Sequence, residues 1–163
     1  KVFFYDHFGS SDEDNLLSRI RYFGVALGCK YIILDHLSIV VSGLEGGDER
    51  RIIDNTMTKI RTLVEELGIG MILVSHLKRP NSDKGHEDGL RTSLAQLRGS
   101  AGIGQLSDIV IGLERNQQSQ ETSDLSTVRI LKNRWTGETG ICCQLQYSKE
   151  TGRMTEQLEE VDF

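Results

Sequence analysis

Asp35 is the residue whose setting most clearly indicates chemistry, because this carboxylate directly follows an uninterrupted apolar run that begins at Tyr31. Such a run is typical of a buried strand, and open α/β sheets bind ligands at the carboxyl ends of their strands. Burying an unpaired carboxylate is costly, so we expect Asp35 to face a metal ion, a basic group or water. The alternative is an ordinary strand-end or helix-capping carboxylate in solvent.

A second apolar run, residues 70–74, ends on Ser75 and His76. If both runs are strands of one sheet, Asp35 and His76 lie at the same edge. An acid suited to magnesium beside a neutral hydrogen-bonding group is typical of a nucleotide phosphate site. A lone histidine at a strand end is more often structural, so the neighbouring Asp35 strand is what favours a functional role for His76.

The loop that follows His76 is rich in basic residues. From residue 77 to Arg98, five basic residues outnumber three acidic ones in a chain whose formal net charge is -5. Lysine and arginine on a loop suit phosphate backbones without reading bases, although an ordinary solvated loop has a similar composition. The basic residues are Lys78, Arg79, Lys84, Arg91 and Arg98.

Lys132 and Arg134 precede a turn at Gly137, and both would project from one face of an edge strand. Arg134 either snorkels over the sheet or reaches a phosphate bound to a neighbouring subunit, as arginine fingers do. The phosphate-loop pattern G-x-x-x-x-G-K-[ST] is absent from the sequence. A nucleotide site built from these residues alone would therefore be half complete.

The elements that position these residues alternate between apolar strands and amphipathic helices. Predicted strands are 2–5, 31–34, 70–74 and 109–113, and predicted helices are 16–27, 48–67 and, interrupted by glycines, 94–106. This alternation predicts an α/β fold with a mostly parallel sheet covered by helices on both faces. Residues 128–132 and 141–147 flank the Gly137 turn and predict a hairpin added antiparallel at the sheet edge.

Length and composition are those of one folded domain: the chain has 163 residues, 37% hydrophobic and 26% charged. No apolar run is long enough for a membrane span, and no signal-peptide pattern is present, so we expect an intracellular protein without membrane contact. Three cysteines without metal-ligand spacing favour buried thiols over zinc. The acidic net charge argues against indiscriminate nucleic-acid binding. The apolar run 2–5 directly after Lys1 predicts a chain that begins inside a larger fold.

Five stretches of the chain carry recognisable motifs: Tyr31–Ile39, Ile72–Lys78, Leu97–Ser100 with Gln105–Asp108, Leu113–Gln118 and Leu131–Gly137. Together and in this order they resemble the helicase domain of the DnaB-like superfamily. The resemblance is closest to the phage primase-helicases and mitochondrial Twinkle, and it extends to about Met154.

The resemblance implies a RecA-like core that assembles into a ring of identical subunits, usually a hexamer. Helicases of this superfamily hydrolyse ATP or another nucleoside triphosphate with Mg2+ between subunits, move 5′ to 3′ along single-stranded DNA and part the duplex. Two alternatives remain, a truncated RecA-like module that binds DNA or partners without hydrolysis and a RecA-type recombinase.

The resemblance also assigns roles at the nucleotide. Asp35 corresponds to the acid that holds Mg2+ largely through water. His76 corresponds to the residue that senses the terminal phosphate and relays its presence to the DNA-binding loop. Arg134 matches the arginine finger, Lys132 its companion, and Tyr147 a residue that stacks on the nucleotide base.

The expected DNA-binding residues form two groups, one in the central-channel loop and one in the motif that supports it. They are Lys78, Arg79 and Lys84 in the loop, and Arg98, Gly99 and Gln105 in the supporting motif.

By the same resemblance, residues 1–154 are the distal part of the helicase domain, and residues 155–163 are an acidic tail. The phosphate loop and the catalytic glutamate of the family are expected upstream of Lys1, so the chain is expected to be inactive alone. The tail resembles those by which phage helicases contact their replication polymerase. We expect action at the replication fork, in the bacterial cytoplasm during phage infection or in the mitochondrial matrix.

Overall fold

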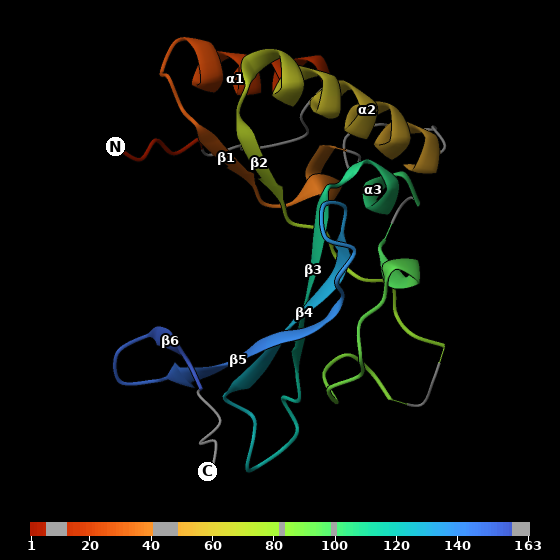
Figure 1. The fold of residues 1–163 in the computed structure, drawn as a ribbon, viewed down its shortest axis with the longest axis vertical. Coiled ribbons are helices and arrows are strands. Elements are labelled where there is room, and N and C mark those ends of the chain that lie inside the picture. Colours follow the sequence, from red (N-terminus) through yellow and green to blue (C-terminus); the bar gives the residue numbers. More distant parts are fainter. Residues whose placement is uncertain (6–12, 41–48, 82–83, 99–100, 158–163) are drawn as a thin grey trace. The chain divides into compact units, whose positions relative to one another are not determined.

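The computed structural model describes residues 1–5, 13–40, 49–81, 84–98 and 101–157. The chain forms two compact units, Lys1–His76 with Leu97–Leu106 and Leu77–Gln96 with Ser107–Phe163. The first holds a two-stranded parallel sheet and the second a four-stranded antiparallel sheet (Figure 1). The predicted α/β class is confirmed, although the parallel part of the described sheets is only one pair of strands.

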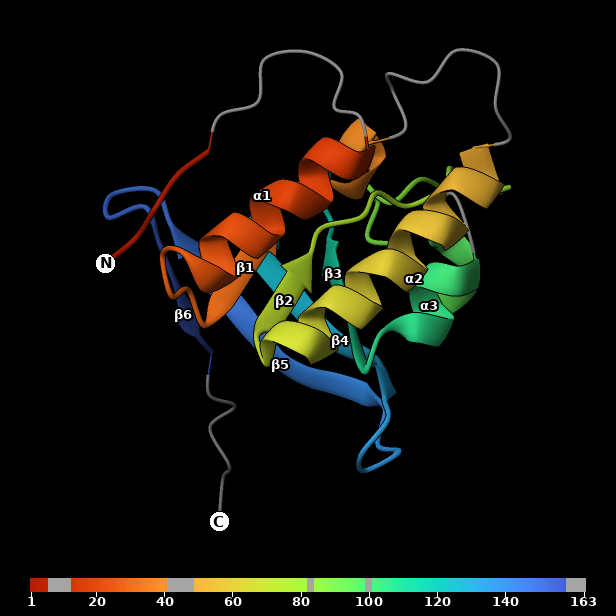
Figure 2. The same cartoon turned by 90° about the horizontal axis from the view of Figure 1, so that it is seen from above.

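In the first unit, two helices lie side by side across one face of the parallel strands (Figures 1 and 2). The elements in chain order are α1 (Glu13–Val25), β1 (Tyr31–Leu34), the 3-10 helix η1 (Leu37–Val40), α2 (Glu49–Leu67), β2 (Gly70–Leu73) and α3 (Ala101–Leu106). Strands β1 and β2 pair with Tyr31 opposite Gly70 and Leu34 opposite Leu73. Helix α3 packs against α2.

The core of the first unit lies between these helices and the inward face of the strands. Its buried residues recur at helical and strand spacing, which is why each element offers one apolar face. They are Ile20, Ile60, Leu63 and Ile69, with Ile32, Met71 and Leu73 packed against them. On the opposite strand face, Ile33 and Ile72 are 68% and 55% exposed. The expectation that helices cover both faces is therefore wrong for the described residues.

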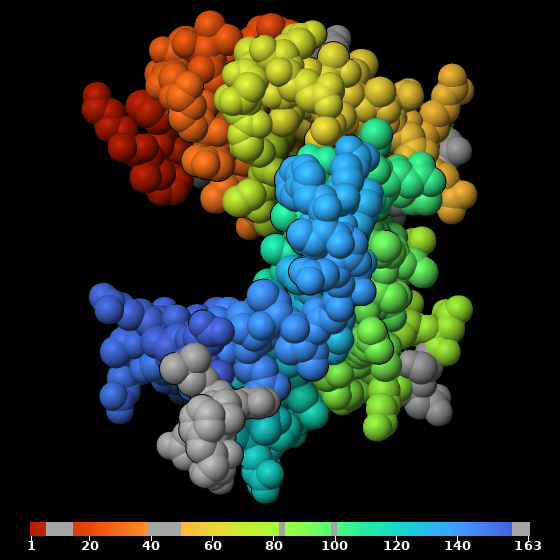
Figure 3. All heavy atoms as spheres, in the orientation of Figure 1, coloured from red at the N-terminus to blue at the C-terminus, as the bar shows by residue number. Residues whose placement is uncertain are grey.

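The second unit is built on an antiparallel sheet in the order β3-β4-β5-β6. Its strands are β3 (Ile109–Arg115), β4 (Leu125–Asn133), β5 (Gly140–Ser148) and β6 (Arg153–Glu156). The predicted hairpin is confirmed as β4 and β5, but β4 also pairs with β3 and is not the edge strand that we expected. Figure 3 shows β5 and β6 (blue) open at the surface, where Ile141 and Met154 are exposed.

Other sequence expectations differ from the structure. Residues 2–5 are exposed and pair with no described strand, so the predicted buried strand is wrong. Cys142 is exposed and Cys143 is only half-buried, because both lie on β5, which is open to solvent. Cys29, between α1 and β1, is also only half-buried. Within the expected tail, Thr155 and Glu156 belong to β6, while residues 158–163 lie outside the described residues. No described helix is long and apolar enough to cross a membrane.

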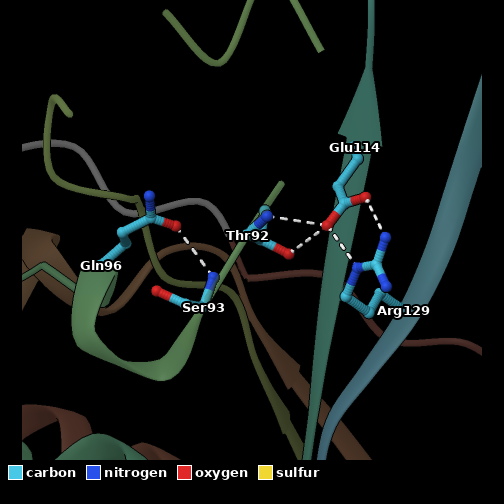
Figure 4. Close-up of polar contacts among 5 residues, drawn as sticks. All are labelled: Thr92, Ser93, Gln96, Glu114 and Arg129. Carbon is cyan, nitrogen blue, oxygen red and sulfur yellow. Dashed lines mark hydrogen bonds and ion pairs between the residues drawn. The ribbon is translucent and has the colours of Figure 1, made fainter. Parts of the chain in front are cut away.

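A buried carboxylate ties residues 77–96, which we call the basic segment, to the sheet (Figure 4). Glu114, at an inward position of β3, accepts hydrogen bonds at Oε1 from the backbone N–H and the hydroxyl of Thr92, at 2.7 and 2.8 Å. Arg129 of β4 donates from Nε to Oε1 at 2.7 Å and from Nη2 to Oε2 at 2.9 Å. Gly112 allows this approach, because a Cβ there would lie 2.1 Å from the Thr92 hydroxyl oxygen.

These contacts keep Glu114 ionised. Burial by itself raises the pKa of Glu114, but the hydrogen bonds from Arg129 and Thr92 outweigh burial and lower the pKa from 4.5 to about 2. In turn, the hydrogen bond to Glu114 raises the pKa of Arg129. The contact is therefore a permanent ion pair at neutral pH.

Replacing Glu114 by Gln should flatten the pH dependence of stability in acid. Because folding lowers the pKa of Glu114, the ionised group stabilises the fold fully above about pH 4.5, and this stabilisation is lost as the pH falls toward about 2. Urea unfolding midpoints of parent and Glu114→Gln should therefore converge between neutral and acid pH. Glu121→Gln, at an exposed glutamate, is the control. A midpoint difference that stays constant with pH would contradict the ion pair.

Candidate functional site

The first unit places three predicted site residues at the carboxyl-terminal edge of its parallel strands. Asp35 directly follows β1, and its side chain is exposed. His76 follows β2 and is also exposed, and its carbonyl oxygen accepts a hydrogen bond from the backbone N–H of Arg98 at 3.0 Å. The structure thus brings Asp35, His76 and Arg98 to one edge, while their chemical roles stay predictions.

Backbone hydrogen bonds fix this edge. The N–H of Val74 donates to the carbonyl of Leu34, and the N–H of Leu37 donates to the carbonyl of Val74, both at 2.9 Å. Leu37 is 2% exposed and anchors the start of η1 in the unit. The chain therefore turns inward two residues after Asp35, which leaves the carboxylate at the surface.

His36 also belongs to this edge, although the sequence motifs did not single it out. Its ring meets the His76 ring edge-on, with 4.4 Å between the ring centroids and 60° between the planes. The Nδ1 atom of His36 is buried and has no hydrogen-bond partner among the described residues. The sequence did contain a signal for this contact, because a histidine lies two residues after each of the apolar runs 31–34 and 70–74. The contact restricts how the His76 ring can turn.

The donor set at this edge fits a magnesium ion held largely by water. Within the described ranges, no group of three or more His, Cys, Asp or Glu side chains could hold a metal ion by itself. Magnesium in nucleotide sites takes one or two protein carboxylates, and waters and phosphate oxygens complete its octahedron. The exposed carboxylate of Asp35 suits one such position.

In the second unit, Lys132 and Arg134 lie at the end of β4 and contact the residues just before β3. The Lys132 ammonium donates to the carbonyl of Ser107 at 2.7 Å. The Arg134 guanidinium forms an ion pair with Asp108 at 3.0 Å, and its backbone N–H donates to the Asp108 carbonyl at 2.9 Å. The Arg134 side chain is still 48% exposed, so it remains accessible to a ligand.

The turn after β4 follows from its sequence. The side-chain oxygen of Asn133 accepts hydrogen bonds from the backbone N–H groups of Trp135 and Thr136, at 3.1 and 3.3 Å. Gly137 has a φ of 74°, which glycine adopts without strain. An asparagine turn closed by glycine therefore determines where Arg134 leaves the sheet.

Tyr147 lies at the opposite end of the β4–β5 hairpin from Arg134. Its backbone N–H donates to the carbonyl of Asp124, just before β4 begins, and the residue is 36% exposed. Nine steps of chain from Leu125 to Arg134 correspond to roughly 30 Å of strand. One chain therefore does not bring Tyr147 and Arg134 together.

The described part of the basic segment presents four exposed cations, the predicted DNA-binding residues Lys78, Arg79 and Lys84 and, in addition, Arg91. Its described backbone is held at both ends of the segment and in its middle. The N–H of Lys78 donates to the carbonyl of Gln96 at 2.7 Å, and the N–H of Gln117 donates to the carbonyl of Glu87 at 2.8 Å. Together with the contact between Thr92 and Glu114, these bonds make the segment part of the second unit.

The supporting motif is described in part. Arg98 is exposed, and Gln105 is exposed on α3; both belong to the first unit. Gly99 lies outside the described residues. The basic segment belongs to the second unit, so the predicted DNA-binding residues are distributed over both units.

Solved structures resemble this fold. A DnaB-like replicative helicase, described with its interactions with primase, matches with a TM-score of 0.73 and 22% identity over 92% of this chain and 36% of that one. A KaiC-like protein from the archaeon Pyrococcus horikoshii matches with a TM-score of 0.60 and 20% identity over 90% of this chain and 57% of that one. At these identities the likeness shows the fold, which is RecA-like as the sequence resemblance predicts.

Curated relatives carry closer sequence similarity. The DNA helicase/primase of Enterobacteria phage T3 is 46% identical over 148 residues, which are 91% of this chain and 26% of that protein. A probable plasmid replicative DNA helicase of Chlamydia psittaci is 29% identical over 152 residues, 92% of this chain and 32% of that protein. This chain thus spans about a quarter to a third of the length of these relatives. The family model of the DnaB-like helicase C terminal domain matches residues 2–156, and the chain belongs to this family.

Proposed function

We propose that this chain forms the carboxyl-terminal part of a ring-shaped replicative DNA helicase. It would couple hydrolysis of a nucleoside triphosphate to 5′-to-3′ movement along single-stranded DNA. The observation that carries this function is the continuity between the strand edge and the basic segment. His76 stands at the edge that carries Asp35, and the basic segment begins at the next residue. A contact with the terminal phosphate would therefore lie two residues from Lys78.

The relatives support the same function. One is described as a DNA helicase/primase of a phage and the other as a probable replicative helicase of a plasmid. Neither supports the mitochondrial location that the sequence resemblance left open. We therefore place the activity at a replication fork in a bacterial cell.

Asp35 and His76 would act on the triphosphate. In this assignment Asp35 holds Mg2+ largely through water, and His76 forms a hydrogen bond with the terminal phosphate. Bound Mg2+ neutralises charge on the phosphates during phosphoryl transfer. A phosphate loop, whose motif this sequence lacks, would come from another part of the protein.

The second unit would serve two different nucleotides. Arg134 and Tyr147 lie at opposite ends of the hairpin, separated by roughly 30 Å of strand, which exceeds the reach of one triphosphate. We therefore assign Tyr147 to base stacking at one nucleotide, and Arg134 with its companion Lys132 to the triphosphate bound by a neighbouring subunit. A closed ring of identical subunits, six by the resemblance, provides such neighbours.

The acidic tail enters this proposal as a docking peptide for a replication polymerase. Residues 156–163 contain four acidic residues, no basic residue and the aromatic Phe163. Only the residues up to 157 are described, so composition alone supports this part.

Replacing both Lys78 and Lys84 by Ala should weaken single-strand binding regardless of sequence. Each lost phosphate contact should also reduce the slope of log affinity against log salt by about 0.7. Fluorescence anisotropy of labelled oligonucleotides over a range of salt concentrations measures both quantities. Lys149→Ala, at an exposed lysine on the same unit, is the control. Equal slopes for the double variant and the parent would refute the DNA-binding role.

Asp35→Asn should abolish hydrolysis in the assembled protein. Arg134→Ala should lower the rate of hydrolysis about a thousandfold, because no guanidinium then stabilises the charge of the transition state. Nucleotide binding and DNA binding by Arg134→Ala should remain. Mixed rings of the two variants should recover activity, because some interfaces then combine an intact Asp35 with an intact Arg134. Arg153→Ala, an exposed arginine of β6, should act like the parent in both assays. A crosslink that places Arg134 beside Asp35 of its own chain would contradict action between subunits.

A further inference from the structure

Strand β3 connects the two functional regions of the second unit. Immediately before its first residue, Asp108 holds Arg134 in an ion pair. Near its other end, Glu114 holds Thr92 of the basic segment through two hydrogen bonds. The same strand therefore has a fixed contact with the candidate arginine finger at one end and with the candidate DNA-binding segment at the other.

We infer that Glu114 is a positioning residue that transmits DNA binding at the basic segment to Arg134. This role rests on the proposed function and adds to it the contact through which DNA would control hydrolysis. Glu114 has no direct part in binding nucleotide or DNA in this assignment. It acts through Thr92 on one side and through Arg129 on the other (Figure 4).

The geometry makes the cluster of Thr92, Glu114 and Arg129, which we call the Glu114 cluster, rigid. The side chains of Glu114 and Arg129 are only 8% and 12% exposed, so separating them would leave a buried charge without its partner. The planar guanidinium contacts both carboxylate oxygens, which fixes the orientation of the two strands as well as their distance. Thr92 is 2% exposed and contributes both its backbone N–H and its hydroxyl. A movement of Thr92 must therefore move Glu114 and Arg129 with it.

The Glu114 cluster lies close to Arg134 along the chain. Arg129 lies in the middle of β4, Arg134 directly follows its last residue, and β3 pairs with β4 along its whole length from Ile109 to Arg115. Displacement of the basic segment would thus shift the β3–β4 pair and Arg134 together. A second connection runs along the backbone from His76 to Lys78 and does not involve Glu114. Variants of the Glu114 cluster therefore distinguish the route through Glu114 from the route along the backbone.

The test compares hydrolysis with and without single-stranded DNA in the complete, assembled protein. Glu114→Gln keeps the size of the side chain but loses the ion pair with Arg129. Thr92→Val keeps the shape of the side chain but lacks the hydroxyl, whereas Thr92→Ser retains the hydroxyl. We expect Glu114→Gln and Thr92→Val to reduce the stimulation of hydrolysis by DNA about 2- to 30-fold. Thr92→Ser should behave like the parent. Basal hydrolysis, the KM for nucleotide and DNA affinity should stay unchanged in all three.

Arg115→Ala is the matched control. Arg115 follows Glu114 on β3, points to the other face of the strand, and donates from Nε to the carbonyl of Ser123 at 2.6 Å. This variant removes an arginine contact from the same sheet without touching Thr92, so it should retain full stimulation by DNA.

Equal stimulation in Glu114→Gln and the parent would overturn the positioning role and leave the proposed function intact. An equal loss in Arg115→Ala, or a parallel loss of basal hydrolysis in Glu114→Gln, would also overturn it, because the residue would then only support the fold. If the parent itself hydrolyses nucleotide without any response to DNA, the proposed function fails and the positioning role fails with it.

Discussion

The parallel pairing of β1 and β2 is the constraint on which the candidate nucleotide edge depends. Because both strands run in the same direction, with Leu34 opposite Leu73, the residues that follow them emerge at one edge. The pairing requires a close approach, since a Cβ at Gly70 would lie 2.7 Å from the ring of Tyr31. A slip of one residue would turn the alternate side chains of a strand to the opposite face and separate its core residues from α1 and α2.

The second unit places cations at fixed points along one sheet. Each of the two predicted site cations at the end of β4 has a partner close to the start of β3, the Ser107 carbonyl for Lys132 and the Asp108 carboxylate for Arg134. The length of β4 then keeps the arginine away from Tyr147. If one nucleotide contacts both an Arg134 and a Tyr147, these two residues must therefore come from different chains. In the proposed function, hydrolysis is accordingly a property of the assembly.

Local patterns in the sequence predicted most elements and part of the site. The apolar periodicity that ends at Gly68 predicted α2, which ends at Leu67, and apolar runs predicted the strands before Asp35 and Ser75. The same logic failed at residues 2–5, because an apolar run becomes a strand only when a partner strand accepts its backbone hydrogen bonds.

The cluster around Glu114 could not be predicted in the same way. Its partners, Thr92 and Arg129, lie 22 and 15 residues away along the chain, and only the register of β3 against β4 and the course of the basic segment bring them together. An acid at an inward position of an apolar strand was the available signal. His36 was missed for a related reason, since its contact with His76 depends on which strands are neighbours.

The most direct measurement of the central claim is an experimental structure of the assembled protein with single-stranded DNA and a non-hydrolysable nucleoside triphosphate. We predict that Asp35 and His76 of one subunit and Arg134 of its neighbour lie around the same triphosphate, with the basic segments of all subunits along the DNA. A structure in which Asp35 and Arg134 of one chain contact the same nucleotide, or in which the basic segments lie away from the DNA, would contradict this account.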